Sequence, residues 1–127
     1  MARSDPFAGS KIDWLAIDEE GALALFATAG SGFVPASVLA HVERHQALCA
    51  AFEEPDRGTP RVWDAQASLG LYVYDWKPHR GPYRRVRSPM VAPAAGLRNA
   101  ASGIPSLPVY PGSFRRSRRI AADWHVG

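Results

Sequence analysis

The sequence has little of what marks a secreted, membrane-spanning or zinc-clustered protein. Its single cysteine, Cys49, excludes an intrachain disulfide and a cysteine-based zinc cluster, which suits a reducing compartment. No apolar run approaches the ~20 residues that a membrane-spanning helix needs. Residues 1–10 contain no apolar core of a secretory signal. The sequence therefore predicts a soluble, cytoplasmic protein.

Acidic residues are almost missing from the second part of the chain. Residues 1–75 hold five Lys or Arg and eleven Asp or Glu, a net charge of −6. Residues 76–127 hold ten Lys or Arg and only Asp123, a net charge of +9. Such asymmetry predicts either a polyanionic partner for the basic part or two parts that attract each other within the fold. We favour mutual attraction as the simpler interpretation.

What the 127 residues do contain is enough for one hydrophobic core. Hydrophobic residues make up 46% of the chain and charged residues 21%, close to globular averages, and four Trp, four Tyr and five Phe supply bulk. This length predicts a single domain over residues 1–127. Within it we expect a flexible N-terminus at residues 1–10. Residues 89–127, rich in proline and arginine, are expected to be partly irregular.

Two apolar runs on either side of Gly21 predict a β-hairpin. The runs are Lys11–Asp18 and Ala22–Thr28, and Gly21 can adopt the positive φ that a short turn requires. Both runs are apolar at successive positions, so both faces of each strand are apolar. That pattern is typical of central strands covered on two sides. We therefore expect the hairpin in the middle of a sheet.

Further strands are expected towards the C-terminus. Leu69–Trp76 alternates between two faces, and the turn-rich residues after it predict that Tyr83–Ser88 returns as an antiparallel strand. In this second strand Arg85 and Arg87 are expected to share a face. Seven prolines after residue 76 exclude long regular elements there. The remaining candidates are a short strand at Val109–Tyr110 and a strand or helical turn at Ser117–Val126.

The clearest helix in the sequence is Ala36–Glu53, which starts after Pro35 and is rich in helix formers. Its apolar side chains gather on one side at about 100° per residue, and they are Val38, Val42, Leu48, Cys49 and Phe52. The opposite side carries Glu43, Ala47 and Ala50. The patterns together predict an α+β fold. We expect an antiparallel sheet of about four to six strands with one main amphipathic helix packed on it.

The helix places His41, His45 and Cys49 in one row, because successive members are four residues apart. Imidazole and thiolate groups bind Zn²⁺ or Cu, and a Cys49 thiolate with His45 as base could act as a nucleophile. No further ligand is adjacent, although His79 and His125 are candidates elsewhere. The apolar face of a helix is also a poor place for nucleophilic attack. We interpret the row as core residues and predict no metal, no cofactor and no catalytic residue.

The run Gly30-Ser31-Gly32 precedes the predicted helix and resembles a phosphate cradle in outline. Backbone amides at the start of a helix do attract anions. Neither a Walker pattern nor Gly-x-Gly-x-x-Gly is present, and no lysine follows in the right place. We interpret the run as a connection from strand to helix.

Charged residues form two kinds of stretch that could contact a partner. Asp18, Glu19 and Glu20 crowd the hairpin tip, which is either a solvated turn or a contact for a basic partner. Arginines interleaved with aromatic residues are typical of single-stranded nucleic-acid platforms and of protein interface hot spots. No RNP1, KH or zinc-finger motif accompanies them. The arginines are Arg80, Arg84, Arg85, Arg87, Arg115, Arg116, Arg118 and Arg119, and the aromatic residues are Tyr83, Tyr110, Phe114 and Trp124.

Two stretches resemble a known kind of protein. The first is Asp13-Trp14-Leu15-Ala16-Ile17-Asp18-x-x-Gly21, running through Phe26-Ala27-Thr28-x-Gly30-x-Gly32-x-Val34-Pro35. The second is Tyr72-x-Tyr74-Asp75 followed by Pro82-Tyr83-x-Arg85-Val86-x-x-Pro89. Together, over about a third of the chain, they resemble small bacterial proteins that occur as immunity proteins in polymorphic-toxin systems.

The resemblance implies a bacterial cytoplasmic protein that neutralises a toxin by binding it, and it supplies no catalytic residues. We therefore expect a non-enzymatic binding protein that acts by surface occlusion and has no membrane partner. The alternative is a nucleic-acid-associated protein that uses the arginine-rich C-terminal part. An enzyme would need a pocket that joins a helix histidine to a carboxylate. The expected partner-binding residues are Asp18, Glu19 and Glu20, or Arg84, Arg85 and Arg87.

Overall fold

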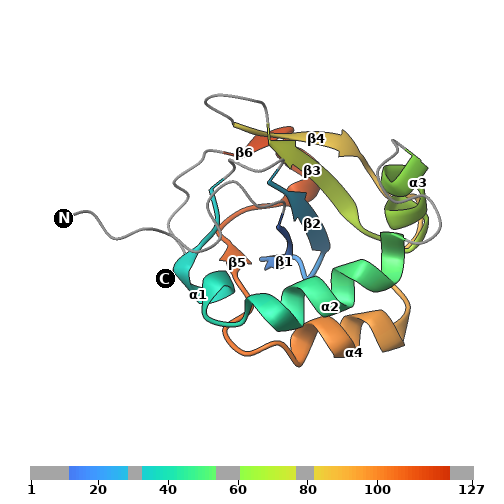
Figure 1. The fold of residues 1–127 in the computed structure, drawn as a ribbon. Helices are drawn as coiled ribbons and strands as arrows, with labels where there is room; N and C mark the ends of the chain where they lie inside the picture. Colours follow the sequence, from blue (N-terminus) through green and yellow to red (C-terminus); the bar gives the residue numbers. More distant parts are fainter. Residues whose placement is uncertain (1–11, 29–32, 54–60, 77–81, 121–127) are drawn as a thin grey trace.

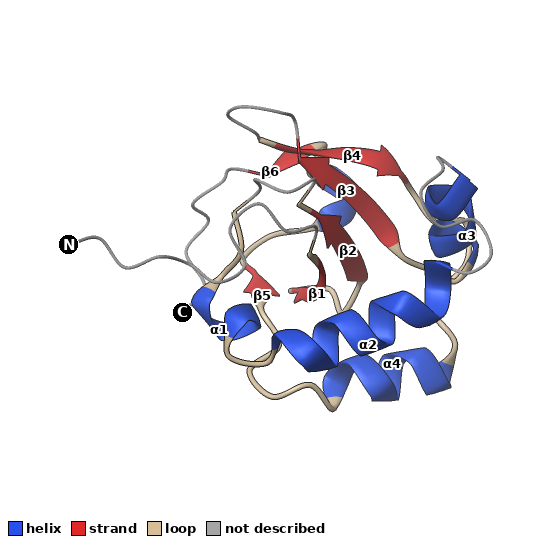
Figure 2. Cartoon of the chain, viewed as in Figure 1, coloured by secondary structure: helices blue, strands red, loops and turns tan. Residues whose placement is uncertain are grey.

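The described residues form an α+β fold built on one mixed sheet (Figure 1, Figure 2). The computed structural model describes residues 12–28, 33–53, 61–76 and 82–120, without the side chains of residues 51–53. The predicted flexible stretch at residues 1–10 lies outside them. In chain order the elements are β1 (Asp13–Asp18), β2 (Leu23–Ala27), α1 (Ala36–Leu39), α2 (Val42–Glu53), α3 (Arg61–Ser68), β3 (Tyr72–Trp76), β4 (Tyr83–Arg87), α4 (Ala95–Ser102), β5 (Val109–Tyr110), the 3₁₀ helix η1 (Phe114–Arg116) and β6 (Arg119–Ile120).

Six strands of the described residues pair in the order β5-β1-β2-β3-β4-β6. The β1–β2, β3–β4 and β4–β6 pairs are antiparallel. The β1–β5 and β2–β3 pairs are parallel, so the expectation of a purely antiparallel sheet is wrong. A parallel pair needs a long crossover connection, and α1, α2 and α3 lie in the connection from β2 to β3. Side-chain alternation predicts a strand but carries no information about its direction.

The predicted hairpin is confirmed as the centre of the sheet. Gly21 adopts a φ of 81° in the turn. Trp14 of β1 lies opposite Phe26 of β2, and both side chains are fully buried. Leu15 and Leu25, on the other face of the same strands, are also buried. Both faces of the hairpin are therefore covered, as its apolar pattern predicted.

Helices cover one face of the sheet. In Figure 1, α2 and α4 run next to one another along this face, and α3 lies beyond the end of α2. The side chains between the helices and the sheet form an aliphatic cluster, which we define as Leu15, Leu23, Leu25, Cys49, Leu71, Val73, Ala101 and Ile104. Burial of this apolar surface is what holds the helices to the strands.

The opposite face of the sheet carries an aromatic cluster, defined here as Trp14, Phe26, Tyr74, Tyr83 and Phe114. The Phe26 ring stacks on Trp14 with centroids 4.3 Å apart and on Tyr74 at 4.9 Å. Residues 111–118, which we call the strap, run from β5 to β6 and place Phe114 of η1 in this cluster. Strands β5 and β6 are the two outermost strands, so the strap joins one edge of the sheet to the other. The sheet curls around the aromatic cluster, and the strap covers it.

The predicted helix Ala36–Glu53 is two helices, α1 and α2, separated at residues 40–41. The His41 N–H donates to the Val38 carbonyl at 3.0 Å, a spacing of three residues that tightens the chain at the break. Val38 of α1 and Val42 at the start of α2 join the aromatic side of the core, whereas Cys49 joins the aliphatic cluster. The two helices together therefore pack against both sides of the core.

The expectation of one main helix is also wrong, since α3 and α4 pack on the sheet as well. The apolar stripe of α2 is confirmed at Val42, Cys49 and half-buried Leu48, while the Phe52 side chain lies outside the described residues. Helix α4 lies within the stretch predicted to be free of long elements. Pro93 precedes it and Pro105 follows it, so these prolines bound the helix instead of interrupting it.

Arg85 and Arg87 of β4 do not contact the same part of the molecule, contrary to the expectation that they share a face. The register of β4 on β3 shifts between Val73 and Tyr74, so that one residue of β4 is extra. Arg85 then lies against the Tyr72 ring on the aromatic side, whereas Arg87 contacts Trp63 of α3. A bulge of this kind leaves no mark in side-chain alternation.

Gly70 is the glycine whose replacement we expect to be most damaging. Its φ is +95°, and an added Cβ would lie 2.4 Å from the Pro93 backbone nitrogen. Gly70→Ala should therefore lower the free energy of unfolding by at least about 2 kcal/mol in urea denaturation. Gly96→Ala is the matched control, because nothing lies within 4 Å of its added Cβ in α4, and a gain of up to about 1 kcal/mol is expected. Equal effects of the two substitutions would contradict this prediction.

Candidate functional site

Asp18, one of the predicted contact residues, is buried and holds the hairpin turn against the strap. Its Oδ1 accepts hydrogen bonds from the backbone N–H groups of Glu20 (2.9 Å) and Ala22 (2.8 Å). Its Oδ2 accepts one from the N–H of Phe114 (2.8 Å), which begins η1. Since only 4% of Asp18 is exposed, a partner cannot reach the carboxylate without opening this turn.

The other two acidic residues of the tip differ in what they contact. Glu20 accepts a hydrogen bond from the Ser113 hydroxyl (2.7 Å) and pairs with Arg115 (3.3 Å). The Ser113 hydrogen bond, and then the Arg115 charge, lower the pKa of Glu20. Glu19 is exposed, and its backbone N–H donates to the Gly112 carbonyl. At this turn the acidic and basic parts of the chain do attract each other.

Arg85 and Arg87 also have partners inside the molecule. The Arg85 guanidinium donates to the carbonyls of Phe114 (2.6 Å) and Arg115 (2.9 Å), which ties the strap to β4. The Arg87 Nε donates to the Asp64 carboxylate at 2.6 Å. Both arginines are half-buried. Two of the six predicted contact residues, Glu19 and Arg84, are exposed and form no side-chain ion pair among the described residues.

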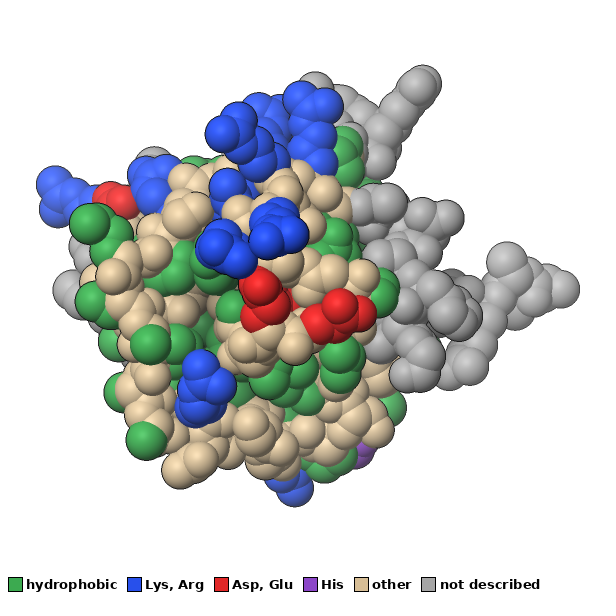
Figure 3. Space-filling model, turned by 180° about the vertical axis from the view of Figure 1, so that it is seen from behind, with side chains coloured by type: hydrophobic (Ala, Val, Ile, Leu, Met, Phe, Trp, Pro, Cys, Tyr) green, Lys and Arg blue, Asp and Glu red, His purple; other side chains and the backbone are tan. Residues whose placement is uncertain are grey.

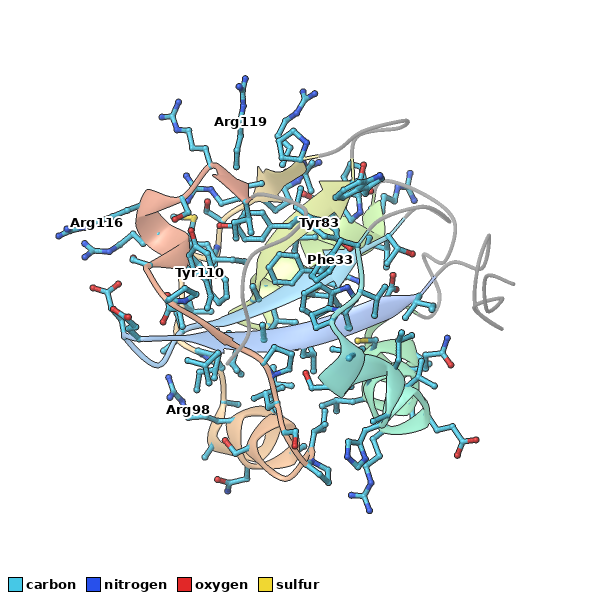
Figure 4. All side chains as sticks on the ribbon, turned by 90° about the vertical axis from the view of Figure 1, so that its left-hand side faces the viewer. Phe33, Tyr83, Arg98, Tyr110, Arg116 and Arg119 are labelled. Atoms are coloured by element: carbon cyan, nitrogen blue, oxygen red, sulfur yellow. The ribbon has the colours of Figure 1, made fainter. Side chains whose placement is uncertain are left out.

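Exposed arginines gather on the outer surface of the strap and at the neighbouring edge of the sheet, on β4 and β6. Figure 3 shows basic side chains side by side on this face, with acidic side chains just below them. In Figure 4, Arg116 and Arg119 point away from the core. Within the described ranges, only Arg115 of this group pairs with a carboxylate. We call the group the arginine ridge, and it consists of Arg84, Arg115, Arg116, Arg118 and Arg119.

Four of the five ridge residues were not among the predicted contact residues. Their signal in the sequence is the run from Arg115 to Arg119, but the sequence does not show where this run lies in the fold. The 3₁₀ turn of η1 and the pairing of β6 with β4 bring this run next to Arg84. The ridge is therefore a product of tertiary structure.

The row of potential metal ligands on α2 is largely inside the protein. His45 is fully buried, and its Nδ1 accepts a hydrogen bond from the Leu15 N–H at 3.1 Å. Cys49 is buried one turn later, and His41 is half-buried. Across the described residues, no three His, Cys, Asp or Glu side chains meet in a way that could hold a metal ion. His79 and His125 lie outside those residues.

Burial sets the protonation state of His45. It lowers the pKa of this imidazole from 6.5 to about 4, with a smaller contribution from the charge of His41. At neutral pH the ring is therefore neutral, and because Nδ1 accepts, its proton is on Nε2. Among the described residues, the Nε2 atom has no hydrogen-bond partner. The Cys49–His45 pair predicted as a possible nucleophile and base is thus closed to substrates.

The aromatic residues interleaved with the arginines serve the core. Tyr83 and Phe114 are fully buried, and Tyr110 is half-buried with its ring stacked on Phe114. The Tyr83 hydroxyl donates to the Phe33 carbonyl at 2.6 Å and accepts from the Trp14 indole. In the part of the chain that the structure describes, these rings offer no open platform for base stacking. Trp124 and Arg80 lie outside that part, as does the run Gly30-Ser31-Gly32.

Comparisons with known proteins give no relative for this chain: no family model, no curated protein and no solved structure matches it. The resemblance to immunity proteins therefore stays a prediction from the sequence. Among the helices described here, none combines the length and the apolar composition needed to cross a bilayer. The site must be interpreted from its own geometry.

Substitution of two neighbouring acidic residues at the hairpin tip should distinguish a structural carboxylate from a surface carboxylate. Asp18→Ala removes the acceptor of three backbone N–H groups, and we expect a loss of about 2–4 kcal/mol in the free energy of unfolding. Glu19→Ala removes an exposed carboxylate and should change that free energy by less than about 0.5 kcal/mol. Urea denaturation measures both. A harmless Asp18→Ala would show that the strap does not depend on this carboxylate.

Acid should destabilise the protein through His45. The folded pKa is about 4, below the unfolded value, so between these values the unfolded chain binds more protons and stability falls as pH falls. Between pH 6.5 and 4 the loss should reach up to about 3 kcal/mol. Urea denaturation of the wild type and His45→Gln over this range measures it, because the glutamine does not titrate. Identical pH dependence in both proteins would exclude His45 as the cause.

Proposed function

We propose that this protein is a non-enzymatic binding protein that covers a surface of a partner protein, and that the partner is a toxin domain which it neutralises. The arginine ridge is the observation that supports the proposal. Its guanidinium groups are exposed, and four of the five form no ion pair with a carboxylate among the described residues. Such groups make paired hydrogen bonds to carboxylates and are enriched in protein interfaces.

Occlusion requires no chemistry from the bound protein, only complementary shape and charge. The ridge supplies a positive field that would speed the encounter with an acidic surface. The strap is fixed from the side of the sheet, because the side chains of Arg85, Tyr74 and Asp18 all hydrogen-bond to its backbone. A contact surface held in this way loses little conformational freedom on binding, which favours affinity.

A nucleic-acid partner is the competing explanation for the ridge, because phosphates bind the same guanidinium groups. Single-stranded nucleic acid gains much of its affinity from bases stacked on exposed rings. Here Tyr83 and Phe114 lie inside the aromatic cluster, so these two rings cannot make that contribution. The balance favours an acidic protein surface.

Neutralisation can be tested with the C-terminal domain of the protein encoded directly upstream. We expect that domain to arrest growth when it is expressed alone and growth to resume when this chain is expressed with it. Arg116→Glu with Arg118→Glu should abolish protection, because it reverses two exposed charges of the ridge. Arg44→Glu, an exposed arginine on α2, is the matched control and should still protect. Arrest that persists beside the wild-type chain would contradict the proposal.

The nucleic-acid alternative is tested by titrating the wild-type chain with a generic single-stranded oligonucleotide at several salt concentrations. We expect no micromolar binding at physiological salt. Binding of that strength, falling steeply as salt rises, would replace the proposed protein partner with nucleic acid.

A further inference from the structure

In one row of charged residues across three neighbouring strands, two positive charges lie side by side. The register places Asp75 of β3 opposite Arg84 of β4, and Arg84 opposite Arg119 of β6. Directly opposite side chains on a sheet are neighbours, and like charges in that position are destabilising. Over these three strands the row contains one carboxylate for two guanidinium groups, and the two like charges are adjacent. The same row continues through Ala27 of β2 to Asp13 of β1, two strands away from Asp75.

The row lies on the face of the sheet opposite the aromatic cluster. Tyr83 of β4 and its partner Ile120 of β6 face the aromatic side of the core, so the residues next to them, Arg84 and Arg119, face the other way. Further along this face Val73 is buried in the aliphatic cluster. Arg84 and Arg119 are exposed, so the packed helices do not cover this end of the sheet.

Other arginines of the same region form side-chain hydrogen bonds or ion pairs within the fold, and among the described residues Arg84 and Arg119 form no ion pair. Arg85 holds the strap, Arg87 pairs with Asp64, and Arg115 pairs with Glu20. Asp75 is half-buried, and burial raises the pKa of its carboxyl while the charge of Arg84 opposes that rise. Asp75 therefore offsets part of the Arg84 charge. Within the described ranges no carboxylate pairs with Arg119.

We propose that an aspartate or glutamate side chain of the bound protein completes this row by pairing with Arg119 and Arg84. The inference rests on the proposed function and names the chemistry of the partner at one place on the ridge. Each guanidinium offers five N–H donors and can hold a carboxylate through two of them. A carboxylate here changes the row from one negative and two positive groups to an alternation of charges. It also relieves the repulsion between the arginines.

The decisive variant is Arg119→Glu. Repulsion between Arg119 and Arg84 predicts that the substitution does not destabilise the protein, whereas binding of an outside carboxylate predicts that it weakens binding. Within the isolated protein the substitution places a carboxylate opposite Arg84, so the melting temperature should stay the same or rise. Binding of a carboxylate from outside should weaken by at least about tenfold. Arg44→Glu makes the same charge reversal on α2 and should leave both properties unchanged. A melting temperature that falls together with binding would assign Arg119 a structural role and overturn the inference.

A deca-glutamate peptide tests the site directly. In low salt the peptide should shift the Nε–H resonances of Arg84 and Arg119 in the full-length protein, and Arg119→Glu should remove the effect at Arg84. An oligonucleotide of matched charge is the second probe. Shifts spread evenly over all exposed arginines, or tighter binding of the oligonucleotide than of the peptide, would overturn the proposal of a carboxylate at this pair.

The growth assay separates failure of this inference from failure of the proposed function. If the wild-type chain protects and Arg119→Glu with Arg84→Glu protects equally well, the protein neutralises a toxin but does not use this pair. If the wild-type chain fails to protect, the proposed function itself fails. If the pair is essential, a lysine that replaces one acidic residue of the toxin domain should restore binding to the Arg119→Glu variant.

Discussion

The three backbone hydrogen bonds that end on the Asp18 carboxylate are the contact on which the rest of the structure depends. One oxygen closes the hairpin turn, and the other fixes the first residue of η1, 96 positions later in the chain. Phe114 is placed by this contact, and its ring covers Phe26 on the concave face of the sheet. A carboxylate that accepts several backbone N–H groups replaces its lost hydration well, which is why so polar a group is tolerated inside.

The strap is held from the sheet side as well. The Tyr74 hydroxyl lies within hydrogen-bond distance of the carbonyls of Phe114 and Ser117, and Arg85 donates to two carbonyls of the same segment. The Tyr110 hydroxyl adds a contact to the Ser117 side chain. Side chains beneath the strap thus fix its backbone, and the arginines of the strap point outward. The contacts that close the aromatic side of the core therefore also position these arginines of the ridge.

Patterns over a few successive residues predicted the strands, the turn and the helix face that depend on local structure. The central hairpin, the strands around Val73 and Val86, and the buried stripe of α2 follow from side-chain alternation, helical periodicity and the freedom of Gly21. Strand direction did not follow, because the parallel pairing of β2 with β3 is decided by the helices of the crossover. The break after α1 and the bulge at β4 did not follow either, because they leave no signal in helical periodicity or side-chain alternation.

The candidate site was predictable in composition and not in arrangement. The sequence showed that arginines accumulate in the second part of the chain. It could not show that Arg85 and Arg87 turn inward while Arg84 stays outside, since that division depends on the register shift and on the position of the strap. Asp18 is the opposite case. An acidic hairpin tip is expected to be solvated and open to a basic partner, but the approach of η1 removes Asp18 from solvent.

The order in which the chain is made gives the strap a further importance. Trp14 and Phe26 are synthesised early, but the ring that covers them, Phe114, and the strand β6 that extends β4 come far later in the sequence. Until then the hairpin exposes a wide aromatic surface, and contacts of such long range are slow to form. An emerging chain in this state is a natural substrate for a chaperone, since exposed apolar surface is what leads partly folded proteins to aggregate.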